Sequence, residues 1–258
     1  MEIVQHSAKV WGLCPRDYDK TLRWIEKAAR TCYNSRDRIT EDSAKPFVER
    51  LLKKGHYGIL EHSCAAFFVT GIQHPARFLY KVDGEDVMIG SWLAWDHFLM
   101  RTPNIPIKQG DSLDLRHNHF WRCTVEFETS RAISHQLVRH RLASFLQMSQ
   151  RYVDHSNPRV IEGTWATIPS AVYAVEAAFE TYRSLRRLSL RPEQARDILP
   201  NCTATRIVMT TTVAHLQYII NLRSTKACDP GMRALMKALV TELKKEDWWN
   251  ACNSRESK

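Results

Sequence analysis

The stretch from Ser130 to Tyr152, SRAISHQLVRHRLASFLQMSQRY, constrains this chain more than any other. It places four arginines, two histidines, three glutamines and four serines among apolar residues. Arg139 and Arg141 are two residues apart, about 200° around a helix, so they cannot share one solvated face. Since a guanidinium offers a planar fork of donors that fits a phosphate or a ring carbonyl, the stretch predicts a site for an anionic ligand with a nitrogen ring.

A plainer interpretation is that the arginines form a basic helix end that complements the helix dipole. The segment continues, however, with Ser149, Gln150 and Arg151, a donor-rich turn suited to phosphate oxygens. The chain also carries a net charge of +9, which favours anionic partners such as nucleotides, polyphosphate cofactors or nucleic acid. A basic surface that only keeps the protein soluble would give the same charge.

The seven cysteines show no CxxC spacing, so neither a zinc knuckle nor a disulfide framework is indicated. Reduced thiols in a cytoplasm are the simplest interpretation. No secretory apolar region opens the sequence and no run of about 18 apolar residues occurs, so we expect neither export nor a membrane span. Glu61 and His62 lack a third ligand at suitable spacing, so no metal is expected.

Hydrophobic patterning predicts a mixture of strands and helices. Strands are expected over residues 2–11, 64–70, 124–130 and 207–213. Helices are expected over residues 17–29, 42–54, 85–101, 130–152, 170–190, 191–199, 216–222 and 232–245. Residues 102–118 hold two prolines, a glycine and several charges, which predicts a surface loop. No repeat or long linker divides the 258 residues, so one α/β domain is expected.

Four motifs together resemble the flavin-dependent thymidylate synthases. The first is Arg139-His140-Arg141, seven intervening residues and Ser149, within a string similar to that family along its whole length. The others are HYGILEH at 56–62, RDILP at 196–200 and YIINLRSTKACDPGMR at 218–233. The resemblance covers most of residues 20–240. It implies an α/β (α+β) fold, with a central mixed or antiparallel sheet flanked by helices, in a single domain of residues 1–258. Residues 72–118 match less clearly and are interpreted as an insertion or lid.

The resemblance also implies a set of site residues. Those implied for dUMP are Gln136, Leu137, Val138, Arg139, Gln147, Met148, Ser149, Gln150, Arg151, Arg196 and Arg223. Those implied for FAD are Gly58, Arg139, His140, Arg141, Gln147, Thr212, Val213, Ala214 and Tyr218, with His56 near the flavin or folate. Arg223 is implied as the catalytic group, because it would face the pyrimidine and make C5 more electron-rich. The family builds such sites from different subunits of a homotetramer.

The implied reaction is reductive methylation of dUMP to dTMP in the cytoplasm, with no nucleic-acid or membrane partner. NADPH would reduce FAD, and 5,10-methylenetetrahydrofolate would donate the carbon. No protein thiol need attack C6. Ser149 has no evident adjacent base, so it is interpreted as a ligand contact and not a nucleophile. The chain lacks both GxGxxG and GxxxxGK[ST], so neither Rossmann nor P-loop binding is supported.

Three departures from the family pattern leave alternatives open. Leu146-Gln147 replaces a common Asn-Glu, Thr212-Val213-Ala214 replaces a common Asn-x-Arg, and residues 227–231 replace a common His-Ala-Gln-x-Glu. An arginine contact to FAD is therefore missing. One alternative is a relative that methylates or hydroxymethylates another pyrimidine nucleotide, such as UMP. Another is a basic nucleic-acid-binding protein, against which the basic residues form no single stripe. Singly, His140 could be a structural histidine and Arg196 a surface ion-pair partner of Asp197.

Overall fold

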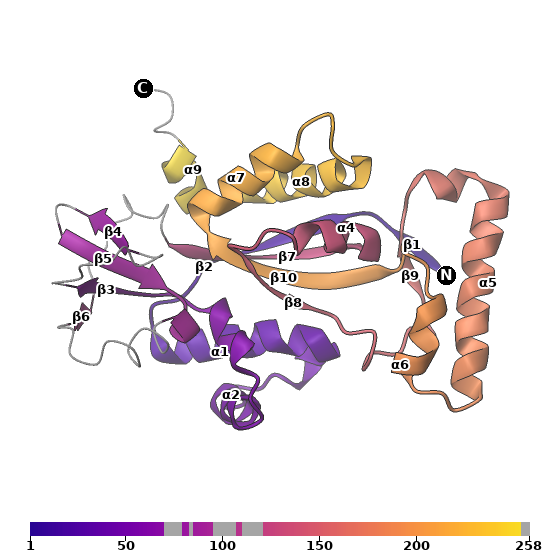
Figure 1. Cartoon of the computed structure of the whole chain (residues 1–258), viewed down its shortest axis with the longest axis horizontal. Helices are drawn as coiled ribbons and strands as arrows, with labels where there is room; N and C mark the ends of the chain where they lie inside the picture. Colours follow the sequence, from indigo (N-terminus) through magenta and orange to yellow (C-terminus); the bar gives the residue numbers. More distant parts are fainter. Residues whose placement is uncertain (70–78, 83–84, 95–106, 110–120, 254–258) are drawn as a thin grey trace.

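The computed structural model describes residues 1–69, 79–82, 85–94, 107–109 and 121–253. A central four-stranded antiparallel sheet has the order β2-β7-β10-β8 (Figure 1). Its strands are β2 (Ser7–Leu13), β7 (Arg122–Ser130), β10 (Ala204–Thr212) and β8 (Ser144–Gln147). The long pair β7 and β10 runs in register along all nine residues, from Ala204 opposite Ser130 to Thr212 opposite Arg122. This confirms the predicted mixed α/β class with an antiparallel sheet.

Alternation along the two central strands separates two faces of this sheet. Val125, Phe127, Ile207 and Met209 form one core with the helices above the sheet. Those helices are α4 (Arg131–Leu137), α7 (Val213–Arg223), α8 (Pro230–Leu243) and α9 (Asp247–Asn253) (Figure 1). No helix was expected over the last of these. The apolar face explains why α7 and α8 cover this side, since together they remove the large side chains of β7 and β10 from water.

The opposite face carries hydroxyls and charges that bond to the first helical layer. The indole Nε1 of Trp24 donates to Thr124 Oγ1 at 3.0 Å, and Arg36 pairs with Glu126 at 2.8 Å. This layer contains α1 (Tyr18–Ala29), α2 (Ala44–Lys53) and the 3₁₀ turns η1 (Arg30–Tyr33), η2 (Arg36–Arg38) and η3 (Tyr57–His62). The Asp17 carboxylate caps α1 by accepting from Lys20 N at 2.8 Å, which confirms the predicted start of that helix.

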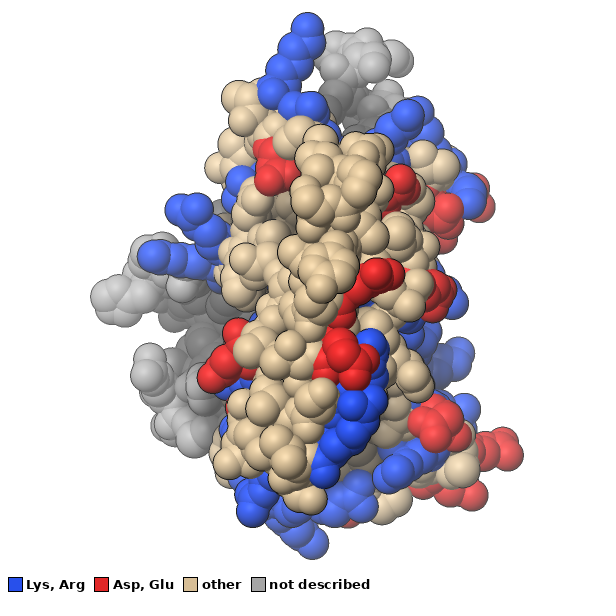
Figure 2. Space-filling model, turned by 90° about the vertical axis from the view of Figure 1, so that its right-hand side faces the viewer, with Lys and Arg blue, Asp and Glu red and all other residues tan. Residues whose placement is uncertain are grey.

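One end of the molecule is formed by a small parallel sheet and the longest helix. Strand β1 (Glu2–Val4) pairs with β9 (Arg159–Ile161), so the single strand expected over residues 2–11 is two strands in different sheets. Beside them lie η5 (Thr164–Thr167), α5 (Pro169–Arg187), α6 (Pro192–Ala195) and η6 (Arg196–Ile198). Figure 2 looks onto this end and shows a largely uncharged band crossed by a few acidic and basic side chains. Tyr173 and Leu188 of this region are more than 70% exposed.

The predicted helix over 85–101 is wrong over its first six residues. Glu85–Gly90 forms β5, which pairs with β3 (Ala65–Val69) and β4 (Leu79–Val82) in a second sheet of order β4-β5-β3-β6. The predicted loop is likewise wrong at β6 (Ile107–Gln109). An apolar strand such as β3 needs partners for its backbone groups on both edges, and this requirement overrides the helical spacing. Residues 92–94 are helical, as predicted, and residues 95–101 and the rest of the predicted loop lie outside the described residues.

The predicted helix over 130–152 is also wrong beyond Leu137. The chain turns at Val138–Ala143 and then enters β8, whose Gln147 lies opposite Ile207 of β10. Because β8 pairs with an edge of β10 that would otherwise be unpaired, sheet hydrogen bonds take these residues from the helix. Arg139 and Arg141 therefore lie in a turn, where both are exposed and His140 between them is buried. The argument that a helix would point Arg139 and Arg141 in different directions therefore does not apply.

In the described residues, no helix is both long enough and apolar enough to cross a membrane.

Candidate functional site

The turn that follows α4 brings His140 to the end of α7. Ser130 Oγ accepts from Ile133 N at 3.2 Å and starts α4, and buried Ile133 and Leu137 fasten the helix to the core. The Arg223 guanidinium at the last residue of α7 donates from Nε to His140 Nε2 at 3.0 Å. It also donates from Nη2 to the Gln136 carbonyl at 3.3 Å. The predicted site residues Gln136, His140 and Arg223, which lie up to 87 positions apart in the sequence, are thus in contact.

His140 is buried and electrically neutral in this arrangement. Burial, Arg223 and His215 together lower the pKa of His140 to about 4. Its ring lies edge-on to His215, with centroids 6.1 Å apart, and His215 stacks on Tyr218 at 5.6 Å with ring planes 18° apart. Tyr218 itself is 55% exposed. We call Gln136, His140, His215, Tyr218 and Arg223 the Arg223 group.

His215 belongs to this group of contacting residues but was not among the predicted site residues. Its backbone N–H donates to Thr212 Oγ1 at 3.2 Å, so the predicted cofactor residue Thr212 is the N-cap of α7. The three-residue spacing of His215 and Tyr218 on a helix was the available signal, because residues at i and i+3 are neighbours on its surface. Val213 and Leu137, two other predicted site residues, have side chains fully buried in the core. They can offer only backbone groups to a ligand.

Gln147 is held by two hydroxyls at the end of β8. Its Nε2 donates to Ser134 Oγ at 2.8 Å and to Thr205 Oγ1 at 3.2 Å. Ser134 Oγ donates to the Arg131 carbonyl at 2.9 Å, so it can only accept from Gln147. This fixes the amide orientation and leaves the Gln147 carbonyl oxygen as the free polar atom. A glutamate could not make the same two donations.

The donor-rich turn follows directly after Gln147, at the end of β8 that lies away from the His140 turn. Met148 N donates to the Arg206 carbonyl at 2.8 Å, and Ser149 N donates to the Cys32 carbonyl at 2.9 Å. Arg151 pairs with Glu193 at 3.0 Å. Arg196 stands close enough to Arg131 that burial and this second cation lower the pKa of Arg131. In the described part of the chain Arg196 forms no ion pair, so the simple surface pairing with Asp197 is not observed. We call Ser149, Arg151, Arg196 and Arg131 the Arg151 group.

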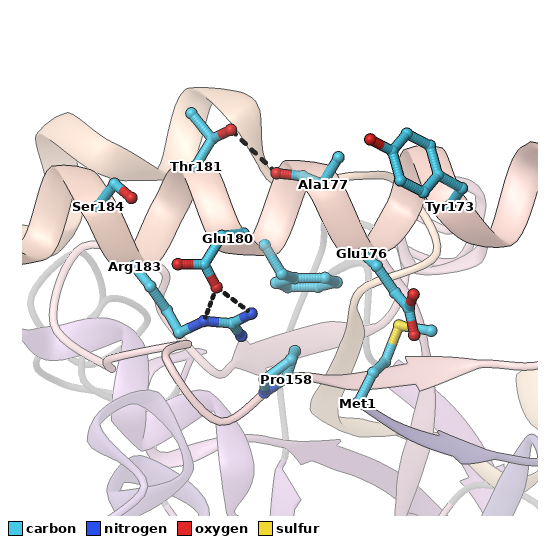
Figure 3. Close-up of a pocket in the computed structure, with 10 residues that line it drawn as sticks. Met1, Pro158, Tyr173, Glu176, Ala177, Glu180, Thr181, Arg183 and Ser184 are labelled. Carbon is cyan, nitrogen blue, oxygen red and sulfur yellow. Dashed lines mark hydrogen bonds and ion pairs between the residues drawn. The ribbon is translucent and has the colours of Figure 1, made fainter.

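Neither of two cavities formed by the described residues brings the two groups together. A cavity of about 630 Å³ runs along α5 between Met1, Pro158 and Tyr173, and none of the predicted site residues lines it (Figure 3). Figure 3 also shows Glu180 bonded to Arg183 at its edge. A smaller cavity of about 140 Å³ includes Met148 as its single predicted residue. His56 and Gly58 are exposed on η3, and a side chain at Gly58 would meet no atom within 4 Å.

The described residues contain no group of three or more acidic, histidine or cysteine side chains placed to hold a metal ion. His62 is fully buried and its Nδ1 lies 2.8 Å from Thr210 Oγ1. Burial and Arg122 lower the pKa of His62 to about 3. Glu61 contributes its carbonyl to Arg122 at 2.8 Å. The Glu61-His62 pair therefore belongs to the buried packing between η3 and the sheet.

The buried cysteines are poor nucleophiles. Burial raises the pKa of the Cys14 thiol to about 11 and raises the pKa of Cys64 and Cys123 as well. Since the thiolate is the reactive form, these three side chains remain inert thiols at neutral pH. No described cysteine forms a disulfide. The chemistry of the site therefore depends on its guanidinium, imidazole and amide groups.

Comparison with known proteins identifies relatives across most of the chain. The family model described as thymidylate synthase complementing protein matches residues 16–76 and 115–247. A flavin-dependent thymidylate synthase of Geobacter sulfurreducens is 26% identical over 233 residues, covering 85% of this chain and 76% of the relative. One from Mycobacterium avium is 25% identical over 261 residues, covering 90% and 81%. One from Thermococcus onnurineus is 33% identical over 129 residues, covering 46% and 52%.

Proposed function

This chain belongs to the thymidylate synthase complementing protein family, and we propose on that basis that it methylates C5 of dUMP to give dTMP in a flavin-dependent reaction. The observation that carries the proposal is the Arg223 group. Arg223 is held by His140 and by the Gln136 carbonyl, and three of its five N–H groups remain available to a ligand. Such a fixed cation suits a pyrimidine ring on which negative charge develops.

Arg223 is the catalytic group in this proposal. Its guanidinium donates to the pyrimidine carbonyl and N3 region and stabilises the negative charge that makes C5 nucleophilic. Because both anchoring bonds are made before substrate arrives, the donors need little reorganisation during the reaction. The proposed dUMP contacts at Gln136, Leu137, Val138 and Arg139 lie on the same α4 turn, and Gln147 offers its free carbonyl oxygen.

The phosphate of dUMP is bound by the Arg151 group. Ser149 and Gln150 are half-buried and Arg151 is exposed in this turn, and Arg196 contributes a second cation near Arg131. Glu193 occupies one side of Arg151, so phosphate binding competes with an exposed ion pair of modest strength. In the homotetramer that we propose, the Arg151 group of one chain meets the Arg223 group of another.

The residues at the start of α7 fit FAD. Arg139 and Arg141 are exposed cations, Tyr218 is an exposed ring stacked on His215, and His215 Nε2 is a buried polar atom without a partner among the described residues. Arg139, His140, Arg141, Gln147, Gly58, Thr212, Val213, Ala214 and Tyr218 are the proposed FAD contacts, with His56 near the flavin or folate. When bound and reduced, the flavin supplies the hydride that completes the methyl group. The proposed reductant is NADPH, the carbon donor is methylenetetrahydrofolate, and the compartment is the cytoplasm.

The test is turnover of the purified protein with defined substrates. The protein is incubated with dUMP, methylenetetrahydrofolate, NADPH and FAD, and dTMP is quantified by mass spectrometry while each component is omitted in turn. We expect dTMP only in the complete mixture. A parallel reaction with UMP tests the alternative substrate, which the changed residues 227–231 keep open. A colourless protein that makes no methylated nucleotide, and that binds RNA with a steep salt dependence, would overturn the proposal.

A further inference from the structure

We propose that His140 is a positioning residue for Arg223 and that His215 supports it in this role. The inference rests on the proposed function, in which Arg223 contacts the pyrimidine. It concerns His140 Nε2, which is the atom that Arg223 Nε reaches at 3.0 Å. Neither the position of this pair nor the part played by His215 follows from the spacing of the motifs, because His140 and Arg223 lie 83 residues apart.

The hydrogen-bond chemistry fixes the tautomer of His140. An arginine side chain offers only donors and is not deprotonated in proteins, so Nε2 of His140 must present its lone pair. The proton of the neutral ring is therefore on Nδ1. The guanidinium is therefore held at two atoms: Nε donates to His140, and Nη2 donates to the Gln136 carbonyl at 3.3 Å. These two bonds define the orientation of the whole planar group.

The surroundings of His140 keep its acceptor free of a proton. The charged or titratable groups that face it from α7 are Arg223 and His215, and Arg139 and Arg141 adjoin it in its own turn. Burial, Arg223 and His215 disfavour the imidazolium, which would present a donor to Arg223 and repel it. The neutral acceptor is thus retained throughout the pH range in which a pyrimidine nucleotide enzyme operates.

His215 supports the ring of His140 from the side. The two imidazoles meet edge-to-face at 68°, and Tyr218 covers the other side of His215 in a nearly parallel stack. The backbone of His215 is fixed by the Thr212 cap of α7. The order Tyr218, His215, His140, Arg223 connects an exposed aromatic ring in the middle of α7 to the guanidinium at its end.

The central experiment compares His140→Gln with His140→Met. The Gln amide oxygen can replace the Nε2 acceptor, whereas Met fills similar volume without it. We expect His140→Gln to retain kcat/KM for dUMP within about threefold. His140→Met should lower it about tenfold to a hundredfold, since a misplacement of a catalytic group by about 1 Å can have an effect of this size. Both variants also remove the proposed His140 contact to FAD, so FAD affinity, read by flavin fluorescence, should change equally in the two, and kcat/KM is compared at saturating FAD. Exposed His135→Asn serves as the control.

A second measurement reads the pairing without turnover. The imidazole ¹⁵N shifts of His140 should report a neutral ring protonated on Nδ1 down to about pH 5. In His215→Phe, which keeps an aromatic ring but removes one cause of the low pKa, the same transition should move to higher pH. The acid limb of kcat/KM for dUMP should move with it, whereas His140→Gln should lack that limb. Protonation of dUMP itself affects the pH profile of every variant equally, so it does not account for differences between them.

The outcomes separate this inference from the proposed function. Equal losses in His140→Gln and His140→Met, or weakened FAD binding with unchanged kcat/KM for dUMP, would overturn the positioning role. A ¹⁵N spectrum that shows the His140 ring protonated on Nε2 would also overturn the positioning role, even if His140→Met failed to fold. In contrast, if the wild-type protein does not methylate dUMP, or if Arg223→Ala leaves dUMP affinity unchanged, the proposed function fails while the ¹⁵N measurement still tests the pairing.

Discussion

A guanidinium does more than carry charge, and Arg223 illustrates the difference between arginine and lysine. Its Nε and Nη2 are bonded inside the chain, and only a planar group with several donors can be anchored twice and still face a ligand. His140 and the Gln136 carbonyl would each lose a partner if a point charge replaced it. The orientation of the site therefore depends on the shape of this side chain.

We predict that Arg223→Lys lowers kcat for dTMP formation by about 10²–10³, the usual effect of removing one preorganised donor. Lysine keeps the charge but has no planar fork, so it cannot satisfy His140 and contact the pyrimidine together. FAD should still bind, because Arg223 is not among the proposed flavin contacts. Single-turnover kinetics and flavin fluorescence measure the two effects. Retention of wild-type kcat would remove Arg223 from the catalytic role.

The cysteines lead to a second prediction at this scale. Cys→Ala at each of the seven positions should leave kcat within about threefold, because no thiol is needed as a nucleophile. At Cys14, Cys64 and Cys123, which are buried and have raised pKa values, the change should instead destabilise the fold by about 1 kcal/mol. Steady-state kinetics normalised to bound flavin, with urea unfolding, separates these effects. A single inactive but folded variant would contradict the prediction.

At the scale of elements, one ion pair fastens α1 to the start of α2. Glu26 is fully buried and accepts from Arg30 Nη2 at 2.7 Å and from Ser43 Oγ at 2.9 Å. Arg30 is also buried and lies over the Phe47 ring at 4.3 Å. A buried charge without its partner is far more costly than an exposed one, so this contact controls whether the first helical layer stays together.

We predict that Glu26→Ala destabilises the protein by about 3–5 kcal/mol, because Arg30 then remains buried without a counter-charge. Exposed Glu180, which pairs with Arg183 and Arg187 on α5, provides the matched control. Glu180→Ala should change the free energy of unfolding far less, because exposed ion pairs contribute little to stability. Urea denaturation of both variants measures the difference. Equal effects would show that burial of the Glu26 pair does not matter for stability.

The sequence located most elements but misjudged those whose partners are distant. The long helix α5 and the strands β7 and β10 follow from local periodicity, and all three were predicted close to their observed bounds. The segments Ser144–Gln147 and Glu85–Gly90 were predicted as helix and are strands. Their short runs are compatible with either period, so the unpaired edges of β10 and β3 decide the outcome.

At the scale of the whole molecule, the separation of the Arg223 and Arg151 groups determines how activity should depend on assembly. If each site takes Arg223 from one chain and Arg151 from another, two different inactive variants can complement each other. Arg223→Ala and Arg151→Ala are each expected to be inactive alone. Co-expressed in equal amounts, they should recover about a quarter of the wild-type sites, since random assembly places two intact residues together in that share.

The recovery is measured as kcat per bound flavin in doubly tagged, co-purified oligomers. Its control is a mixture of Arg223→Ala with His140→Met, two changes within one group, which should recover no such share. Absence of activity in the first mixture, despite verified mixed oligomers, would place both groups in one chain's site and contradict the shared arrangement.

The buried histidines make the stability of the whole molecule depend on pH. The pKa values of His62 and His140 are lowered to about 3 and about 4, whereas an unfolded histidine titrates near 6.5. The unfolded state therefore binds more protons in this window, so stability falls as pH decreases from about 6.5 toward 3. For His62, which is fully buried, the slope should reach about 1.4 kcal/mol per pH unit. The free energy of unfolding of His62→Gln should depend less steeply on pH across this range. An unchanged pH dependence would contradict the prediction.

The sequence by itself determined the mixed α/β class and the family, because local periodicity and motif spacing depend on neighbouring residues, and it predicted the residue types of the proposed site. Only the tertiary structure decided that Arg139 and Arg141 lie in an exposed turn, that His140 accepts from Arg223, and that His215 and Tyr218 stack beside them. These contacts join residues up to 83 positions apart, and pairing across the sheet sets them. A one-dimensional pattern carries no record of which distant edge or ring a segment will meet.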